Sequence, residues 1–302
     1  MKAQAQPQAF AAEPSWKITR IAVSGEPVMS APVISGSPAR THLGRILAGA
    51  ALMFVVLQGG LTLLIPRFDQ TSSALIVATA MFGVAAVIER LAFGRDVRQG
   101  LLALGFGRPR PGALVAATII GVAMLAFFPL YSAATGTPLS LKADWLWVLL
   151  GAIVLNGLAE EALFRGFVFG HLRKAGHSFL RAGLISMAIF GAVHLFLFAS
   201  NPFIVALLAT LLAISAAFPF AFLYERAGRT IWAGVILHVA AHAFRLFDVS
   251  DDQMLTVGSA WILLQFGAVF LVYAFRNNLL RAPRPSGSSQ IGPSMSPSDA
   301  GS

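Results

Sequence analysis

Long apolar runs alternate with short polar loops from about residue 45 to residue 281 of the chain. Each run is close to the ~20 residues that a helix needs to cross the ~30 Å hydrocarbon core of a membrane. We expect helices, because backbone groups in lipid must pair within their own segment. The pattern predicts eight spans: Ile46–Ile65, Ser73–Phe93, Gly112–Ala134, Trp145–Phe169, Phe179–Ala199, Phe203–Tyr224, Thr230–Phe247 and Ser259–Leu280.

The basic residues orient these spans. With the N-terminus in the cytoplasm, 18 of the 22 lysine and arginine residues fall on the cytoplasmic side. Only Arg67, Lys142 and Arg245 fall outside, and Arg165 lies within a span. Cytoplasmic loops are enriched in basic residues. The alternation therefore predicts an all-α polytopic membrane protein with eight transmembrane helices and both termini cytoplasmic. We expect this integral, multi-pass protein in the plasma (inner) membrane.

The two ends of the chain differ from this apolar region. Residues 1–44 and 282–302 are polar and rich in proline and serine, which predicts disordered tails around a transmembrane domain at 45–281. Between the second and third spans, the apolar spacing of residues 98–106 is typical of a short amphipathic connecting helix.

Composition agrees with a membrane environment and excludes several kinds of chemistry. Only 12% of residues are charged, against about 25% in soluble domains. The net charge of +9 raises the question of nucleic acid. The basic residues sit in separate short loops and form no continuous patch, so we expect no nucleic-acid partner. The chain has no cysteine, which excludes disulfides, thiolate nucleophiles and cysteine-bound zinc.

Ionisable residues inside the predicted spans are the strongest functional signal. Such residues are costly in lipid and usually mark a functional site. They lie near mid-span on three helices and can meet at one depth. The set comprises Glu160, Glu161 and Arg165 on the fourth span, His194 on the fifth, and His238 and His242 on the seventh.

Helical spacing divides the two glutamates into different roles. Glu161 and Arg165 are four residues apart, which favours an ion pair. Glu160 points ~100° away around the helix, with Asn156 one turn before it. The spacing predicts one acid that supports the site and one that is free to act as a general base. On the fifth span, Phe190 lies four residues before His194 and can pack against its ring.

Three short motifs resemble those of a known family. Glu160-Glu161-Ala-Leu-Phe-Arg165 resembles its Glu-Glu-x-x-x-Arg motif, and Phe190-Gly-Ala-Val-His194 resembles its Phe-x-x-x-His motif. His238-Val-Ala-Ala-His242 stands where its His-x-x-x-Asn motif belongs. The family is the CPBP intramembrane glutamic endopeptidases, related to type II CAAX prenyl proteases and to bacteriocin-processing and immunity proteins. The resemblance covers about residues 98–247.

The resemblance implies roles for these residues. Glu160 and His194 would activate the attacking water, and Glu161 and Arg165 would hold the site together. His238 and the last motif position would bind the oxyanion of the tetrahedral intermediate. That last position is His242, where the family commonly has asparagine. The resemblance further implies a membrane-associated peptide or protein substrate and no cofactor.

Other readings of the same residues remain open. His238 and His242 share a helix face, as zinc ligands do, so a zinc hydrolase using His194, His238, His242 and Glu160 is one alternative. A proton-coupled transporter or a non-catalytic scaffold is another, although the chain shows no internal repeat. Buried Glu–Arg and histidine contacts can also serve only to pack helices. The sequence leaves the oligomeric state open.

Overall fold

The computed structural model describes residues 38–280. The tails predicted to be disordered lie outside these residues except for 38–44. Those seven residues begin helix α1 (Pro38–Leu64), so the helix extends into the stretch predicted to be a tail. Segments of helix account for most of the described chain, in agreement with the predicted all-α membrane fold.

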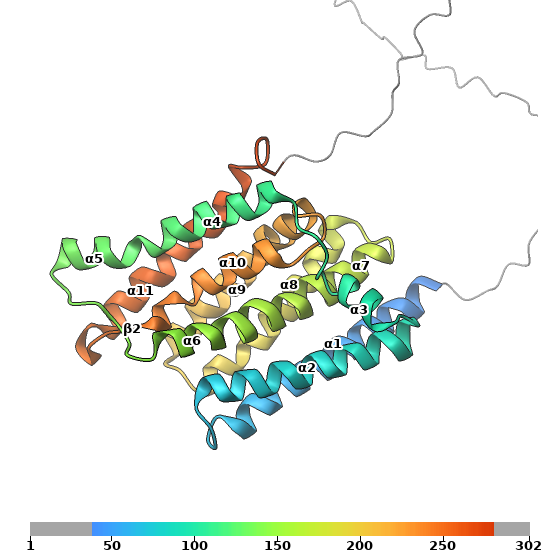
Figure 1. Cartoon of the computed structure of the whole chain (residues 1–302), viewed down its shortest axis with the longest axis horizontal. Coiled ribbons are helices and arrows are strands. Elements are labelled where there is room, and N and C mark those ends of the chain that lie inside the picture. Colours follow the sequence, from blue (N-terminus) through green and yellow to red (C-terminus); the bar gives the residue numbers. More distant parts are fainter. Residues whose placement is uncertain (1–37, 281–302) are drawn as a thin grey trace, which may run out of the picture. The chain divides into compact units, whose positions relative to one another are not determined.

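The helices follow one another with short connections (Figure 1). Those that form the first half are α1, α2 (Gln70–Phe93), α3 (Val97–Ala103), α4 (Pro111–Leu125), α5 (Phe127–Thr135), α6 (Trp145–Gly151), η1 (Ala152–Ala159), η2 (Ala162–Phe169) and α7 (Gly170–Lys174). Those that form the second half are α8 (Phe179–His194), η3 (Leu195–Ala199), α9 (Phe203–Arg226), α10 (Trp232–Ala241), η4 (Ala243–Leu246), α11 (Asp251–Ala268) and η5 (Val269–Tyr273).

Seven of these helical stretches are long and apolar enough to cross a membrane, within residues 38–280. The chain is thus an integral, multi-pass membrane protein. The seventh predicted span, 230–247, corresponds to α10, which has only 10 residues. A helix of that length extends about 15 Å, half of the hydrocarbon core. The count of eight crossings stays a prediction.

Helix α10 is short because the chain after it changes conformation. The 3₁₀ turn η4 follows, and then strand β2 (Phe247–Asp248) pairs antiparallel with β1 (Ser140–Leu141). The sequence pattern predicted helix up to Phe247, and this end of the prediction was wrong. The last span was also misplaced, since α11 begins at Asp251 instead of Ser259.

The long helix formed by α6, η1, η2 and α7 runs through the middle of the bundle. Its apolar residues pack with α1, α2 and α8 in one core, which contains Phe164, Phe167 and Leu172. A second core joins α4, α9, α10 and α11 around Ile120, Leu223 and Trp261. Figure 1 shows α1 and α2 at one side of the molecule and α4 and α11 at the other.

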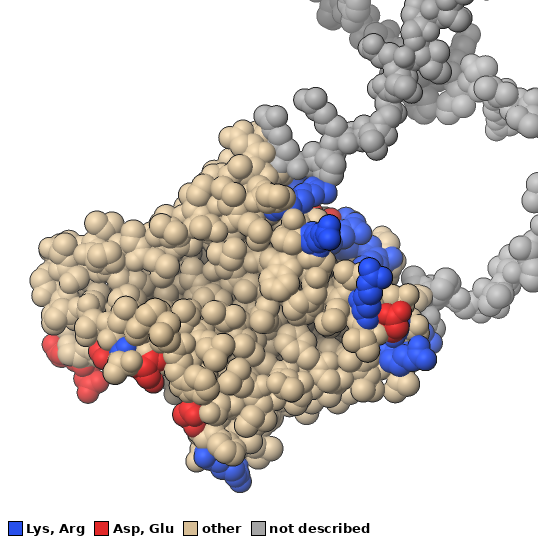
Figure 2. Space-filling view, viewed as in Figure 1, with Lys and Arg blue, Asp and Glu red and all other residues tan. Residues whose placement is uncertain are grey.

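Charge separates the two ends of the bundle (Figure 2). We call one the basic end, where the helix termini carry Arg45, Arg90, Arg95, Arg98, Arg108, Arg110, Arg173, Lys174, Arg181, Arg226, Arg229 and Arg276. The helix termini of the opposite end carry Asp69, Asp144, Asp248, Asp251 and Asp252, with Arg67 and Lys142. Such an asymmetry is typical of a membrane protein whose basic side faces the cytoplasm.

The predicted connecting helix is present as α3. Asp96 caps its first turn and accepts a hydrogen bond from the Gln99 backbone at 2.8 Å. Its far end packs so closely on η2 that a side chain at Gly166 would collide with the carbonyl group of Leu104. This contact fixes the connector against the helix that carries the two glutamates.

Candidate active site

The glutamate motif lies at an unusual place in its helix. Glu160 and Glu161 stand between two π-helical segments, η1 and η2, each of 8 residues. π-helical turns are rare and occur frequently at functional sites. The wider turns alter the 3.6-residue spacing from which the sequence pattern was interpreted. The buried Asn156 and Arg165 belong to these two segments.

Glu161 is the centre of a buried ion-pair network. It is 1% exposed, and its Oε1 accepts a hydrogen bond from Arg165 Nη1 at 3.0 Å. The same oxygen lies 2.8 Å from Nδ1 of His238 on α10. The pair that the sequence spacing predicted is therefore present, and it extends to a third residue on another helix.

Two aromatic rings enclose the guanidinium of Arg165. Its Cζ lies 4.5 Å from the ring centre of Phe190 and 4.7 Å from that of Phe220. Cation–π contacts of this kind stabilise a charge that has little access to water. Phe190 belongs to α8 and Phe220 to α9, so the guanidinium ties three helices together.

Glu160 is less enclosed than its neighbour. Its Oε1 accepts a hydrogen bond from Asn156 Nδ2 at 2.7 Å. Its Oε2 lies 3.7 Å from Nε2 of His238, and its side chain is 15% exposed. His238 therefore stands between the two glutamates, with Nδ1 toward Glu161 and Nε2 toward Glu160.

The imidazole of His194 is fixed by its own helix. Its Nδ1 lies 2.7 Å from the carbonyl oxygen of Phe190, which assigns the proton of a neutral ring to Nδ1. The Phe190 ring packs against the imidazole with the ring centres 4.7 Å apart, as the sequence predicted. Nε2 is left as the nitrogen that can accept a proton.

His242 and Arg245 complete the polar group near the end of α10. The rings of His238 and His242 are stacked, with centres 5.2 Å apart. Arg245 Nη1 donates to Asn156 Oδ1 at 3.2 Å, so Asn156 bridges Arg245 and Glu160. The charge count placed Arg245 on the outside, and sequence analysis did not name it as a site residue. On the predicted helix 230–247, its position seven residues after His238 would share the face of His238, and this was the available signal.

Except for Glu161, the polar side chains described above line one cavity of about 490 Å³. Its polar lining consists of Gln58, Asn156, Glu160, Arg165, His194, Ser200, His238, His242, Arg245 and Gln265. Apolar residues from α1, α8, α9 and α11 form the rest of the wall. The predicted site residues from the fourth, fifth and seventh predicted spans thus share one polar pocket inside the bundle. Glu161 lies behind this lining, in contact with His238.

The donor geometry bears on the zinc alternative. Within the part of the chain that the structure describes, no group of three or more histidine and carboxylate side chains is arranged to hold a metal ion. Glu160, His194, His238 and His242 line the cavity without forming such a group.

Comparison with known proteins identifies a family for this region. Residues 142–244 match the family described as type II CAAX prenyl endopeptidase Rce1-like. The protein named "Putative membrane peptidase YdiL" of Bacillus subtilis (strain 168) is 36% identical over 104 residues. This alignment covers 34% of the chain and 37% of that relative, so it spans little more than a third of either protein. No solved structure matches the chain.

The matched region contains every site residue that the sequence predicted, and Arg245 lies one residue beyond it. Asn156, Glu160, Glu161 and Arg165 lie near its beginning, and His242 lies close to its end. The resemblance to the CAAX-protease family is confirmed over 142–244, a shorter range than the predicted 98–247. The family description names a prenyl endopeptidase, and the name of the relative describes a putative membrane peptidase.

Proposed function

We propose that this chain, whose residues 142–244 are Rce1-like, is an intramembrane endopeptidase that uses water activated by Glu160 and His194. One observation carries the proposal. Glu160 reaches a 490 Å³ cavity shared with His194, His238 and His242, while Glu161 is held by other side chains. The site thus offers one carboxylate for chemistry and one for support.

The reaction would proceed without a covalent intermediate. A water molecule between Glu160 and Nε2 of His194 gives up a proton to one of them as its oxygen attacks the peptide carbonyl carbon. The tetrahedral intermediate collapses when the C–N bond breaks and the proton passes to the leaving amine. General-base catalysis of this type contributes roughly 10²–10⁴-fold to the rate.

The structure constrains the role of His238 in this scheme. Because Nδ1 faces the Glu161 carboxylate at 2.8 Å, that nitrogen carries a proton. A neutral ring would then present an unprotonated Nε2 to the cavity. Only the imidazolium form, balanced by Glu161, can donate from Nε2 to a developing oxyanion. We propose that His238 acts in this charged form.

His242 and Arg245 supply the remaining positive or donor groups. His242 takes the place of the asparagine common in the family, and its stacking on His238 keeps it at the cavity. Arg245 lines the same cavity and holds Asn156. A neutral His242 can donate one hydrogen bond to the oxyanion, as the asparagine amide would.

The remaining expectations belong to the same proposal. We propose that the substrate is a membrane-associated peptide or protein, that no metal is required, and that the basic end lies in the cytoplasm. The hydrogen bond of Arg226 to the Leu280 carbonyl, at 3.2 Å, brings the C-terminal side of the described region to the basic end. Arg45 near the start of α1 donates to the Ala92 carbonyl at 3.2 Å, again at the basic end. An even number of crossings, with α10 added to the seven long spans, would bring both ends of the described region to the basic end.

The decisive test compares membranes that contain the wild-type protein, Glu160→Gln or His194→Ala by mass spectrometry of newly formed peptide termini. Both variants should abolish the termini that the wild type generates, while the purified proteins keep the wild-type thermal unfolding midpoint. Asp144→Asn is a matched control, since Asp144 is an exposed carboxylate outside the cavity. Wild-type cleavage by Glu160→Gln would overturn the proposal.

A further inference from the structure

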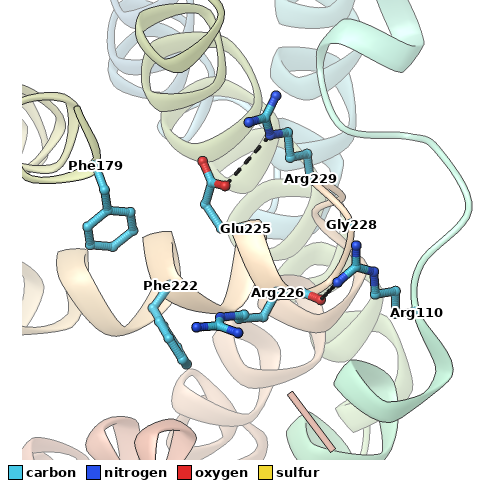
Figure 3. A pocket seen from close by; sticks show the side chains of 7 residues that line it. All are labelled: Arg110, Phe179, Phe222, Glu225, Arg226, Gly228 and Arg229. Atoms are coloured by element: carbon cyan, nitrogen blue, oxygen red, sulfur yellow. Dashed lines mark hydrogen bonds and ion pairs between the residues drawn. The ribbon is translucent and has the colours of Figure 1, made fainter. Parts of the chain in front are cut away.

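A second pocket, of about 600 Å³, lies at the basic end of the bundle and takes no part in the proposed catalysis. Figure 3 shows its lining residues, which come from the loop before α4, the start of α8 and the end of α9. They are Arg110, Phe179, Phe222, Glu225, Arg226, Gly228 and Arg229. Nothing in the chemistry of the candidate active site explains this group.

The pocket carries more positive charge than its neighbours neutralise. Within residues 38–280, Arg110 and Arg226 pair with no carboxylate. Arg110 Nη1 donates to the Arg226 carbonyl at 3.4 Å, and Arg226 Nη1 donates to the Leu280 carbonyl at 3.2 Å. Both contacts leave the formal charges uncompensated. These two guanidinium groups remain available for an anion.

The one carboxylate of the pocket is already engaged elsewhere. Glu225 Oε1 accepts a hydrogen bond from Arg173 Nε at 2.6 Å. Its Oε2 lies 3.7 Å from Nε of Arg229, a longer contact (Figure 3). The pocket therefore holds three arginines and one carboxylate, and that carboxylate also pairs with Arg173, a fourth arginine outside the pocket.

The turn after α9 supports a binding role. Gly228 and Arg229 both have left-handed backbone conformations, with φ of 88° and 61°. An arginine rarely adopts this conformation, because its Cβ is crowded there, whereas glycine adopts it readily. Such an outlier at a pocket is a reason to look for function. The turn holds Arg229, half exposed, at the rim of the pocket.

The two aromatic residues give the pocket an apolar side. Phe222 packs against Arg226, with Cζ 5.1 Å from the ring centre, and Phe179 is the first residue of α8. Arg226 ends one apolar span, Phe179 begins another, and Arg110 directly precedes a third. The pocket therefore lies where three candidate spans begin or end, and it combines arginine side chains with two aromatic rings.

We propose that this pocket binds the headgroup of an anionic phospholipid. The phosphate would lie between the guanidinium groups of Arg110, Arg226 and Arg229, and the first acyl carbons would contact Phe179 and Phe222. Basic pockets between transmembrane helices on the cytoplasmic side are suited to such headgroups. A soluble phosphate would use the arginines but would gain nothing from the two rings.

The test uses the full-length purified protein in nanodiscs of phosphatidylcholine with increasing fractions of phosphatidylglycerol. Native mass spectrometry counts retained lipid, and thermal unfolding reports stabilisation. Wild-type protein should retain phosphatidylglycerol in preference to phosphatidylcholine. The Arg110→Gln/Arg226→Gln double variant should bind it about thirtyfold more weakly, since each basic residue near a lipid surface contributes roughly a factor of five.

Two further variants separate binding from folding. Arg90→Gln is the matched control, because Arg90 is exposed at the basic end but lies on α2, outside the pocket. It should retain the lipid as the wild type does. Arg229→Gly should raise the unfolding midpoint without phosphatidylglycerol, because glycine tolerates the turn, and should lower the affinity for the lipid.

Each outcome decides the proposal. Loss of phosphatidylglycerol binding in the pocket variants, with wild-type binding in Arg90→Gln, supports the proposal. An equal loss of phosphatidylglycerol binding in Arg90→Gln would mean that the whole basic end attracts lipid and would overturn the proposal. Equal retention of both lipids by the wild type would do the same. Inorganic phosphate that displaces phosphatidylglycerol at similar concentration would identify a soluble anion as the occupant and exclude the lipid.

Discussion

Glu161 and Gly234 lie so close together that a Cβ atom on Gly234 would stand 2.5 Å from Glu161 Oε2. Helix α10 can thus approach the glutamate helix only because position 234 lacks a side chain. The Oε2 atom is buried and, among the described residues, has no hydrogen-bond partner. The carboxylate is therefore held by its Oε1 contacts and by the space that glycine leaves.

Gly234→Ala should displace the Glu161 carboxylate and with it Arg165 and His238. Overpacking of this kind destabilises proteins by about 1–3 kcal/mol. We expect cleavage to fall by about a hundredfold, because small misplacements of catalytic groups cost that much. Thermal unfolding and initial cleavage rates measure the two effects. Gly83→Ala, in α2 with open space around it, is the control and should change neither.

Arg165→Ala should lower the free energy of unfolding, an effect that an activity assay alone would not show. The substitution removes the partner of the buried Glu161 and the cation between Phe190 and Phe220. Leaving a buried charge unpaired costs about 3–5 kcal/mol. The folded yield after purification and the unfolding midpoint should both fall. A variant as stable as Arg181→Ala, which removes an exposed arginine, would contradict a supporting role for the pair.

Asn156 and Arg245 should act on Glu160 as a unit. Asn156 donates to Glu160 and accepts from Arg245, so the loss of either frees the Glu160 carboxylate. We expect Asn156→Ala and Arg245→Gln each to lower kcat about tenfold, the value of one hydrogen bond. KM should change little. The double variant should lose little more than either single one, because coupled residues are not additive. Additive losses would show that the two residues act separately.

Chelation should leave cleavage intact. The proposed reaction needs only carboxylate and imidazole groups, and no described cluster is suited to a metal. The measurement is the cleavage rate before and after prolonged chelator treatment, with the metal content determined on the same sample. Loss of activity that zinc restores would reject general-base catalysis by Glu160 and favour the zinc hydrolase.

Asp69 should make the loop between α1 and α2 sensitive to strong acid. Hydrogen bonds from the Ser72 side chain and backbone, and from Trp147, lower the pKa of Asp69 from 3.8 to about 2. Because the folded pKa lies below the unfolded value, this stabilisation is complete above pH 3.8 and is lost as pH falls through about 2. Asp69→Asn should abolish that pH dependence, observed as the unfolding midpoint of the purified protein between pH 5 and pH 2. An unchanged pH profile in Asp69→Asn would contradict this assignment.

The composition of the candidate site could be predicted from the sequence because membranes make charge expensive. Glu160, Glu161, Arg165, His194, His238 and His242 stood out as ionisable residues in apolar runs, and the structure places all but Glu161 at one cavity wall. Glu161 lies directly behind His238. Their catalytic roles stay predictions.

The parts that sequence could not supply depend on local backbone and on contacts between helices. The 3₁₀ turn after α10 and the β1–β2 pair bring Arg245 to Asn156, whereas the count of basic residues had put Arg245 on the outside. At the last span, Asp251 and Asp252 form the first turn of α11, where acidic residues favour the helix dipole. A search for apolar runs detects neither the turn and strand pair after α10 nor the acidic first turn of α11.

The π-helical segment before Glu160 has a consequence for how this site tolerates insertions and deletions. Each residue of an α-helix adds about 100° of rotation, which is also the angle between Glu160 and Glu161. Removing one residue from Ala152–Ala159, with the winding of the remaining residues unchanged, would rotate everything after it by the angle of one residue. The second glutamate would then point where the first one does now. In this helix, the length of the preceding segment decides which carboxylate meets the cavity.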